Sequence, residues 1–376
     1  MFNEELSDQS MMAKSVDTVL SIRHLHVKFR LRGQVLHAIR GISLDVTRHE
    51  TLAIVGESGA GKSVLMKNLC GLLDQNGWVD SGSILYNGMD LASFKSEKDW
   101  SRVRGKHVAM VMQDPMTSLN PLKTIGWQIE EALKYNQQLH GSAARNRMLE
   151  LLTDVGIPDT EKRSRQYPHE FSGGMRQRVV IAIALACNPK LLVCDEPTTA
   201  LDVTIQAQIL KLIHDLKEKY GLTLIYITHD LGVVANVADR IAVMYAGDIV
   251  ELGTCEEVFF DPRHPYTWAL LSSLPQLGTK KQDLYAIQGT PPNLFQPIRG
   301  DAFAPRNPQA LAIDFQHRPP YGQVSSTHKA RTWLLDPRAP VIEPPQAVRS
   351  IRTLFERGKF DYSKKNPQGG NGKWQV

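Results

Sequence analysis

One eight-residue segment constrains the fold of this chain more than any other. Residues 56–63 read GESGAGKS and match the pattern G-x-x-x-x-G-K-[ST] in full. An apolar run at residues 51–55 precedes the segment, and a helical pattern starts near Lys62. Glycines let such a loop curl until its N–H groups converge on phosphate oxygens, and the helix N-terminus adds positive potential. The segment therefore predicts a strand, a phosphate-binding loop and a helix, in that order.

The residue types in this loop predict what each position does. Lys62 can reach the β- and γ-phosphates of a nucleotide, and the Ser63 hydroxyl can ligate Mg²⁺. The alternative is a glycine-rich turn with a solvent-facing lysine. A nucleophile elbow, G-x-S-x-G, would need glycine at position 60, where this chain has alanine. The remaining predicted contacts to phosphate come from the loop itself: Gly56, Ser58, Gly59, Ala60 and Gly61.

A second segment joins an apolar run to two carboxylates. Residues 191–194 read LLVC, as in a parallel strand buried on both faces, and Asp195 and Glu196 follow. Ligands bind at the carboxyl edge of parallel α/β sheets. Asp195 is therefore predicted to hold Mg²⁺, and Glu196 to act as general base on the attacking water. The alternative is an acidic turn after a strand.

A third segment places small residues at the start of an apolar helix. Ser172, Gly173 and Gly174 precede the apolar run at residues 179–186. A helix N-terminus without bulky side chains is a second anion site. One nucleotide needs only one phosphate-binding loop, so this second site is predicted to face the nucleotide of another subunit.

The hydrophobic pattern divides the chain into segments of different character. Residues 1–18 form a polar tail, residues 117–170 are polar and helical, and the region after residue 262 is rich in proline and predicts loops. Residues 364–376 have the composition of a disordered tail. Strands are predicted at 19–29, 42–46, 51–55, 191–194 and 222–227, a hairpin over 241–252, and helices at 128–139, 143–155, 205–216 (ending near Gly221) and 348–355.

Composition excludes several classes of protein. Hydrophobic residues make up 42% and charged residues 22% of the 376, as in a globular protein with a large core. No apolar run approaches the ~20 residues that span a bilayer, and the N-terminus lacks a secretory signal. The net charge of +5 is too diffuse to indicate a nucleic-acid partner. Four scattered cysteines, without a CxxC pair, predict reduced and mostly buried thiols.

Five motifs together resemble one family. They are GESGAGKS at 56–63, QDPMTSLNP at 113–121, YPHEFSGGMRQR at 167–178, CDEPTTALDVTIQAQ at 194–208 and THDLGVVA at 228–235. In this combination the chain resembles the nucleotide-binding subunit of an ABC transporter over about residues 19–345. More narrowly, it resembles the D-type ATPase of bacterial oligopeptide/dipeptide importers. HPYTWALLSSLP at 264–275 and GTPPNL at 289–294 resemble the C-terminal extension of that subfamily.

The resemblance implies a fold and a domain order. The fold is an α/β P-loop NTPase, an ABC cassette with a RecA-like core, an inserted α-helical subdomain and a loop-rich C-terminal extension. The implied order is a flexible tail over 1–18, an ATPase domain over 19–262 with its helical subdomain at about 117–185, the extension over 263–345, and a basic helix with a disordered tail over 346–376.

The resemblance also implies roles for single residues. Gln113 matches the glutamine that senses the γ-phosphate and the metal, and His229 matches the switch histidine beside the γ-phosphate. Asp202 matches an aspartate at the interface of two cassettes, and Ser172, Gly173 and Gly174 match the signature that contacts the partner's ATP. Phe29 lies where an aromatic ring stacks on adenine, although a core phenylalanine of a strand is an equal alternative. Lys62, Gln113, Glu196 and His229 are thus the predicted catalytic residues, with Ser63, Gln113 and Asp195 at the metal.

The chain departs from many relatives in its extension. Where those relatives carry four cysteines that resemble an iron–sulfur site, this chain has other residues, and no cysteine follows Cys255. Because thiolates hold such clusters, we expect no iron–sulfur cluster. The pattern resembles Gram-positive versions of the subunit, and the substituting residues are Asp301, Asn307, Asp314 and Thr332.

The implied function is ATP hydrolysis coupled to oligopeptide uptake, with ATP and Mg²⁺ as cofactors. The implied partners are a second ATPase subunit of the F-type, two membrane-spanning permease subunits and an extracellular peptide-binding protein. The implied location is the cytoplasmic face of the membrane. Alternatives are an importer of dipeptides, nickel or another small solute, a soluble ABC ATPase of DNA repair or translation, and an interaction protein that does not hydrolyse ATP.

Overall fold

The computed structural model describes residues 17–199, 201–235, 237–273 and 287–356. The chain divides into two compact units. The first contains the chain up to Ala53 and Gly61–Thr228, and the second contains Ile54–Ala60 and the chain from His229 onward. The phosphate-binding loop therefore begins in the second unit and ends in the first.

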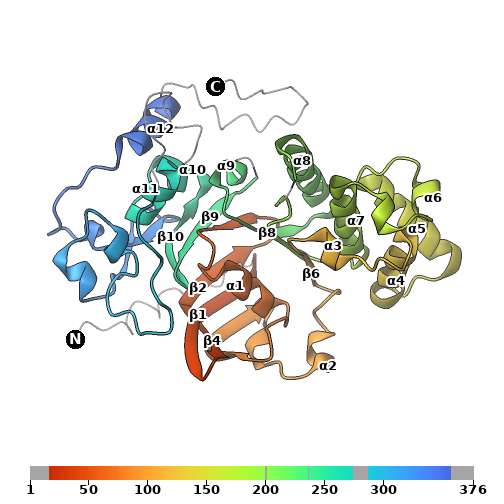
Figure 1. The fold of residues 1–376 in the computed structure, drawn as a ribbon, viewed down its shortest axis with the longest axis horizontal. Coiled ribbons are helices and arrows are strands. Elements are labelled where there is room, and N and C mark those ends of the chain that lie inside the picture. The colour runs from red at the N-terminus through yellow and green to blue at the C-terminus, as the bar shows by residue number, and fades with distance from the viewer. Residues whose placement is uncertain (1–16, 200, 236, 274–286, 357–376) are drawn as a thin grey trace. The chain divides into compact units, whose positions relative to one another are not determined.

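The first unit opens with an antiparallel sheet whose neighbouring strands have the order β2-β1-β4-β5. Figure 1 labels β1, β2 and β4 of this sheet. Buried and more exposed residues largely alternate along its two long strands, as expected for a sheet with one face on the core. The predicted strands at 19–29 and 42–46 are confirmed within them. The strands are β1 (Thr18–Leu31), β2 (Gln34–Thr47), β4 (Gly77–Tyr86) and β5 (Met89–Asp90).

The centre of the first unit is a sheet whose neighbours have the order β3-β8-β7-β6, with β6, β7 and β8 paired in parallel. Every residue of β3, β7 and β8 is buried, so continuous apolar runs rather than alternation mark these strands. All three were predicted at their positions. The unit's strands here are β3 (Thr51–Val55, its last two residues in the second unit), β6 (Val108–Val111), β7 (Leu191–Asp195) and β8 (Thr223–Thr228).

Two helices connect these strands along the chain: one follows β3, and the other lies between β7 and β8. The predicted helix near Lys62 is α1 (Lys62–Leu69), and the predicted helix at 205–216 is α8 (Val203–Tyr220). Gly221 ends α8 in the left-handed conformation, with φ of 61°, which glycine adopts without steric cost. Shorter elements are the 3₁₀ helix at Leu91–Ser93 and α2 (Glu97–Trp100).

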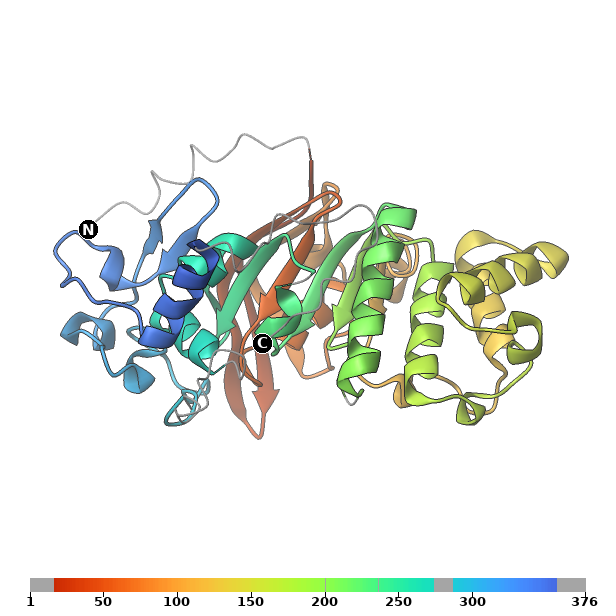
Figure 2. The ribbon, with the colours of Figure 1, turned by 90° about the horizontal axis from the view of Figure 1, so that it is seen from above.

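The expected helical insertion is confirmed as a cluster of packed helices, seen in yellow and green in Figure 2. The helix α4 begins after Thr124, whose side chain accepts a hydrogen bond from Trp127 N–H. Helices α4, α5 and α7 contact one another, and α7 also contacts α8 and β6. The elements are α3 (Pro115–Ser118), α4 (Ile125–Gln137), α5 (Gly141–Asp154), α6 (Thr160–Arg163), a 3₁₀ helix at Pro168–Glu170 and α7 (Gly173–Ala186).

The second unit is built on an antiparallel sheet with the neighbour order β11-β12-β10-β9. The predicted hairpin is confirmed as β9 (Arg240–Tyr245) and β10 (Asp248–Thr254), which pair antiparallel. The predicted basic helix is α12 (Gln346–Glu356). The other elements are α9 (Leu231–Val234), α10 (Cys255–Phe260), α11 (Pro265–Ser272), β11 (Tyr321–Gln323), β12 (Lys329–Arg331) and 3₁₀ helices at Ala304–Arg306, Ala312–Phe315 and Trp333–Leu335.

The compact units do not divide the chain at the expected domain boundary between residues 262 and 263. β12 lies in the expected extension and pairs with β10, which lies in the expected ATPase domain. This pairing is one of the contacts that join these two regions in the second unit. The proposed tail at 364–376 lies outside the described residues.

The cysteines agree with their prediction. All four are free, three are buried, and burial raises the pKa of Cys70 and of Cys194 to about 12. Within the described residues, no helix combines the length and the apolar character that crossing a membrane requires.

Candidate functional site

The loop at residues 56–63 has the backbone conformation that its glycines predict. Gly56, Gly59 and Gly61 have φ of 156°, 80° and 99°, and α1 begins directly after Gly61. A Cβ on Gly56 would lie 2.1 Å from the backbone oxygen of Met244 in β9. Only glycine fits at that point, because the backbone of the hairpin passes against the loop.

Some residues of the loop are exposed to solvent and others are buried. Ser58, Gly59 and Ser63 are exposed, whereas Gly56 and Ala60 are buried. Lys62 is only 5% exposed at the first position of α1. The exposed residues leave backbone N–H groups and two serine hydroxyls accessible at a helix N-terminus, where a phosphate is favoured.

Ser63 and Asp195 meet, although 132 positions separate them. The Ser63 hydroxyl donates to Asp195 Oδ1 at 3.1 Å, and Asp195 is the last residue of β7. Burial raises the pKa of Asp195, and the neighbouring Glu196 adds to that rise, while the Ser63 hydroxyl and Lys62 oppose it. A bound divalent cation stabilises a buried carboxylate, because it compensates for the water that would otherwise solvate the negative charge. A neighbouring hydroxyl supplies a second oxygen ligand. The two side chains thus fit the predicted Mg²⁺.

Gln113 and Glu196 also meet. Gln113 Nε2 donates to Glu196 Oε2 at 2.9 Å, and the Thr199 hydroxyl donates to the same oxygen at 3.0 Å. Glu196 has φ of 45°, which a non-glycine residue rarely adopts, and its N–H donates to Ile227 O in β8. This conformation turns the Glu196 side chain away from the direction that a regular strand would give it. Thr199 was missed, and its only sequence signal is its place three residues after Glu196.

The serine and glycines predicted as a second anion site begin α7. Ser172 caps the helix by accepting a hydrogen bond from Met175 N–H at 3.4 Å. Ser172 and Gly173 are exposed, so this helix N-terminus is accessible. A Cβ on Gly174 would lie 2.7 Å from Ile205 Cγ2 in α8, which gives this glycine a packing reason of its own. Asp202, predicted at a cassette interface, is exposed and caps α8 by accepting from Ile205 N–H at 3.0 Å.

We expect Gly174→Ala to lower the free energy of unfolding by about 1 kcal/mol, because its methyl group overlaps Ile205. Gly173→Ala is the matched control, since its Cβ would lie an ordinary 3.6 Å from Leu201. Urea denaturation of both variants measures the difference. Equal unfolding midpoints for the two variants would contradict this packing argument.

The structure also places two further predicted residues, Phe29 and His229. Phe29 is 8% exposed, and its ring lies over Gly77, where a Cβ would be 2.5 Å from it. That environment is the one expected of a core phenylalanine, and stacking on adenine stays a prediction. His229 directly follows β8 and is exposed. Its role also stays a prediction.

The four residues expected at the cysteine positions of other relatives have a shared local role in the extension. In each case a side-chain oxygen accepts a hydrogen bond from a backbone N–H group two or three residues away, as in Asx and Ser/Thr turns. The acceptor and donor pairs are Asp301 with Phe303, Asn307 with Gln309, Asp314 with Leu311 and Thr332 with Leu334. Oxygen side chains here stabilise turns, which a cysteine thiol does only weakly.

Models of protein families match two parts of the chain. Residues 39–199 match the model described as ABC transporter, and residues 250–313 match the oligopeptide/dipeptide transporter C-terminal region. Among solved structures, cbiO1 of Clostridium perfringens is similar with a TM-score of 0.57 and 30% identity, covering 65% of this chain and 92% of that one. The dimeric cassette MJ0796 bound to ADP and Pi is similar with a TM-score of 0.56 and 26% identity, covering 63% and 98%.

Curated relatives match nearly end to end. The oligopeptide transport ATP-binding protein AmiE of Streptococcus pneumoniae is 55% identical over 340 residues, which cover 90% of this chain and 96% of that protein. OppD of Bacillus subtilis, another oligopeptide transport ATP-binding protein, is 56% identical over 348 residues (91% and 97%). The dipeptide transport ATP-binding protein DppD of Lactococcus lactis is 53% identical over 346 residues (92% and 99%).

Fold, phosphate-binding loop and carboxylate pair together define an ATP-binding cassette of the ABC transporter family, to which this chain belongs. Within that family, it is one of the oligopeptide/dipeptide transport ATP-binding proteins. The resemblance stated from the sequence is confirmed at both levels.

Proposed function

We propose that this chain binds and hydrolyses ATP to energise the import of oligopeptides. The observation that carries the chemistry is the arrangement at the carboxyl end of β7, where Asp195 contacts the phosphate-loop serine and Glu196 contacts Gln113. The substrate class is supported by the near end-to-end similarity to oligopeptide transport ATP-binding proteins.

In the proposed ATP complex, backbone N–H groups of residues 56–63 bind the phosphates and Lys62 neutralises the β- and γ-phosphates. Ser63 and Asp195, with Gln113, would hold Mg²⁺. Mg²⁺, when bound, neutralises charge on the phosphate oxygens during phosphoryl transfer. It is usually held by one or two protein oxygens together with substrate phosphates, which suits the Ser63–Asp195 pair.

Glu196 is the proposed general base. Its Oε2 already accepts two hydrogen bonds, from Gln113 and Thr199, so the carboxylate is held in one orientation. A base held this way can orient a water molecule and accept its proton as the γ-phosphoryl group transfers. His229 is proposed to donate to the γ-phosphate, and Asp202 to lie at the interface between cassettes.

A second cassette completes each proposed site. The exposed N-terminus of α7, with Ser172 and Gly173, would bind the γ-phosphate of ATP held by the partner. We propose that this partner is a different, F-type subunit, and that two permease subunits and a peptide-binding protein complete the importer. The proposed location is the cytoplasmic face of the membrane, with the helical insertion at about residues 117–185 transmitting motion to a permease and Gln113 as hinge.

Transport by the assembled importer tests the proposed function. The complex is reconstituted in vesicles, and ATP hydrolysis is measured while peptides of increasing length are supplied with the binding protein. ATP-dependent uptake of longer peptides is the expected result. Uptake confined to dipeptides would favour the class named by the dipeptide relatives, and hydrolysis stimulated by DNA or ribosomes would contradict import.

We expect Asp195→Asn to raise the Mg²⁺ concentration required for hydrolysis by about tenfold, because a neutral amide is a weaker ligand for a hard cation. Titrating Mg²⁺ at saturating ATP measures the shift. Asp215→Asn, at an exposed position of α8, is the control. An unchanged Mg²⁺ requirement would contradict the assignment of Asp195.

A further inference from the structure

Glu57, the second residue of the phosphate-binding loop, places a negative charge in the segment proposed to bind a triphosphate. A carboxylate within a loop that binds a triphosphate repels the ligand unless a positive charge neutralises it. The Glu57 side chain is 25% exposed, so solvent screens it only in part. The loop therefore needs a cation close to Glu57 that the nucleotide does not displace.

Arg306 of the C-terminal extension supplies that cation. Its guanidinium binds the Glu57 carboxylate through both nitrogens, Nη1 to Oε2 at 2.6 Å and Nη2 to Oε1 at 3.1 Å. Such a bidentate pair fixes orientation as well as charge. The Arg306 side chain is only 5% exposed, so this ion pair is screened less than one on the surface.

The extension and β9 fix the Arg306 guanidinium in turn. Nε donates to Gln288 O at 2.9 Å, Nη2 donates to Ile287 O at 3.3 Å, and Nη1 donates to the Tyr245 hydroxyl at 3.2 Å. Every guanidinium nitrogen therefore has at least one acceptor. Since these acceptors hold the guanidinium in place, Arg306 loses little further side-chain entropy when it binds the Glu57 carboxylate.

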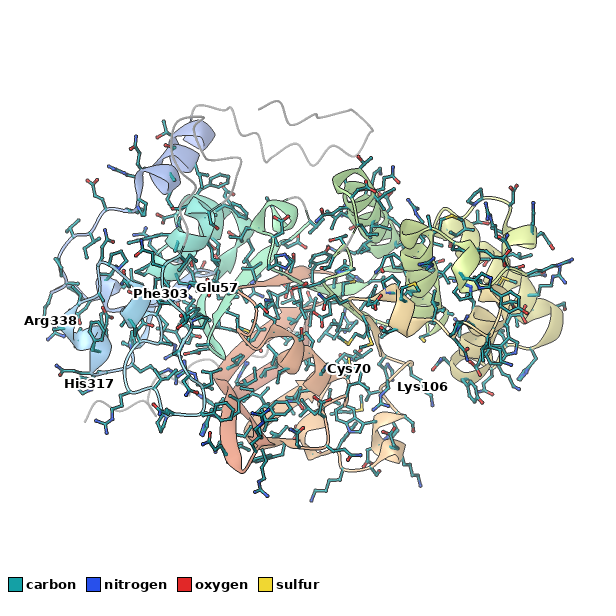
Figure 3. All side chains as sticks on the ribbon, viewed as in Figure 1. Glu57, Cys70, Lys106, Phe303, His317 and Arg338 are labelled. Carbon is teal, nitrogen blue, oxygen red and sulfur yellow. The ribbon has the colours of Figure 1, made fainter. Side chains whose placement is uncertain are left out.

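Backbone and aromatic contacts hold the same turn of the loop. Glu57 N–H donates to the Tyr266 hydroxyl at 2.8 Å, and Tyr266 is fully buried in α11. The rings of Tyr245, Tyr266 and Phe303 pack together, with centroids 4.5 to 5.4 Å apart. Figure 3 labels Glu57 and Phe303 close to each other in the view, and Arg338 at the outer part of the extension.

The geometry points to Arg306 as a positioning residue for nucleotide binding, through which the C-terminal extension neutralises and orients the first turn of the phosphate-binding loop. This inference rests on the proposed binding of ATP at residues 56–63. It gives the extension a direct effect on ATP affinity. Glu57 and Arg306 are 249 positions apart, and both belong to the second compact unit.

We expect Arg306→Ala to weaken ATP binding about tenfold, because Glu57 then loses the guanidinium that neutralises it and repels the phosphates. The KM for ATP should rise by a similar factor, with kcat at saturating ATP within about twofold of the parent. Binding is measured directly with a fluorescent ATP analogue, and KM and kcat by phosphate release, all in the full-length chain. Arg306→Lys keeps the charge and should recover part of the affinity.

A second substitution separates charge from folding. In the Arg306→Ala background, Glu57→Gln removes the negative charge of the carboxylate and should restore affinity to within about threefold of the parent. Arg338→Ala is the matched control, because Arg338 pairs with Asp336 in the same extension and its side chain is 86% exposed. That control should bind ATP like the parent.

Three outcomes would overturn the inference: Arg306→Ala binding ATP like Arg338→Ala, a lower melting temperature with unchanged affinity, or no recovery in the double variant. Because ATP affinity is measured without ATP turnover, either the inference or the proposed function can be refuted without refuting the other. A parent that binds ATP but never hydrolyses it would refute the proposed function, while the expected order of affinities would still support the role of Arg306.

Discussion

Glu196→Gln is expected to reduce ATP turnover by about two to four orders of magnitude while leaving ATP binding intact, because the amide cannot accept the proton of the attacking water. The substitution preserves size, and the amide oxygen can still accept the hydrogen bonds that Glu196 receives from Gln113 and Thr199. We therefore expect the fold to be retained. A nucleotide that binds without being hydrolysed should also favour the closed pair of cassettes.

Phosphate release and binding of a fluorescent ATP analogue measure the two effects separately, and size-exclusion chromatography with ATP reports the association of cassettes. Glu218→Gln is the matched control, since Glu218 is exposed on α8, far along the helix from Asp202. Normal turnover in Glu196→Gln would remove Glu196 from the role of general base.

Lys62→Ala is expected to weaken ATP binding by about tenfold to a hundredfold, the range for loss of hydrogen bonds to a charged group. Lys62 is 5% exposed at the N-terminus of α1, so its ammonium group acts where solvent screens it little. Hydrolysis should fall together with binding, because the same charge stabilises the phosphoryl group during transfer.

Calorimetric titration with ATP and a turnover assay at raised ATP concentration test this second result. Lys134→Ala, at an exposed position of α4, controls for loss of a lysine that lies outside the loop. Full affinity in Lys62→Ala would show that the backbone of residues 56–63 alone binds the phosphates, against the role assigned to the lysine.

Local features of the site could be predicted from the sequence because neighbouring residues determine them. The strand, loop and helix around residues 51–69 follow from an apolar run, glycines and a helical pattern. Ser172 and Asp202 begin α7 and α8 by capping N–H groups three residues ahead, an interaction that short polar side chains form within one turn. Motif spacing supplied the family, which the relatives confirm.

Contacts between distant positions could not be predicted in this way. Periodicity indicates which face of an element is buried, but the residue that packs against that face depends on the topology. Gln113 meets Glu196 over 83 positions, and Arg306 meets Glu57 over 249. The pairing of β12 with β10 illustrates the same limit, since composition does not reveal it.

The sequence by itself determined the family and predicted the kind of chemistry, because phosphate binding and proton transfer require particular residue types at short, fixed spacings, as in GESGAGKS, the Asp195–Glu196 pair and Ser172-Gly173-Gly174. Only the tertiary structure decided how those groups are held. Met244 requires glycine at position 56, Thr199 orients Glu196, and Arg306 neutralises Glu57. Each of these depends on distances of a few ångströms between segments that the fold brings together, and such distances follow from packing rather than from local sequence.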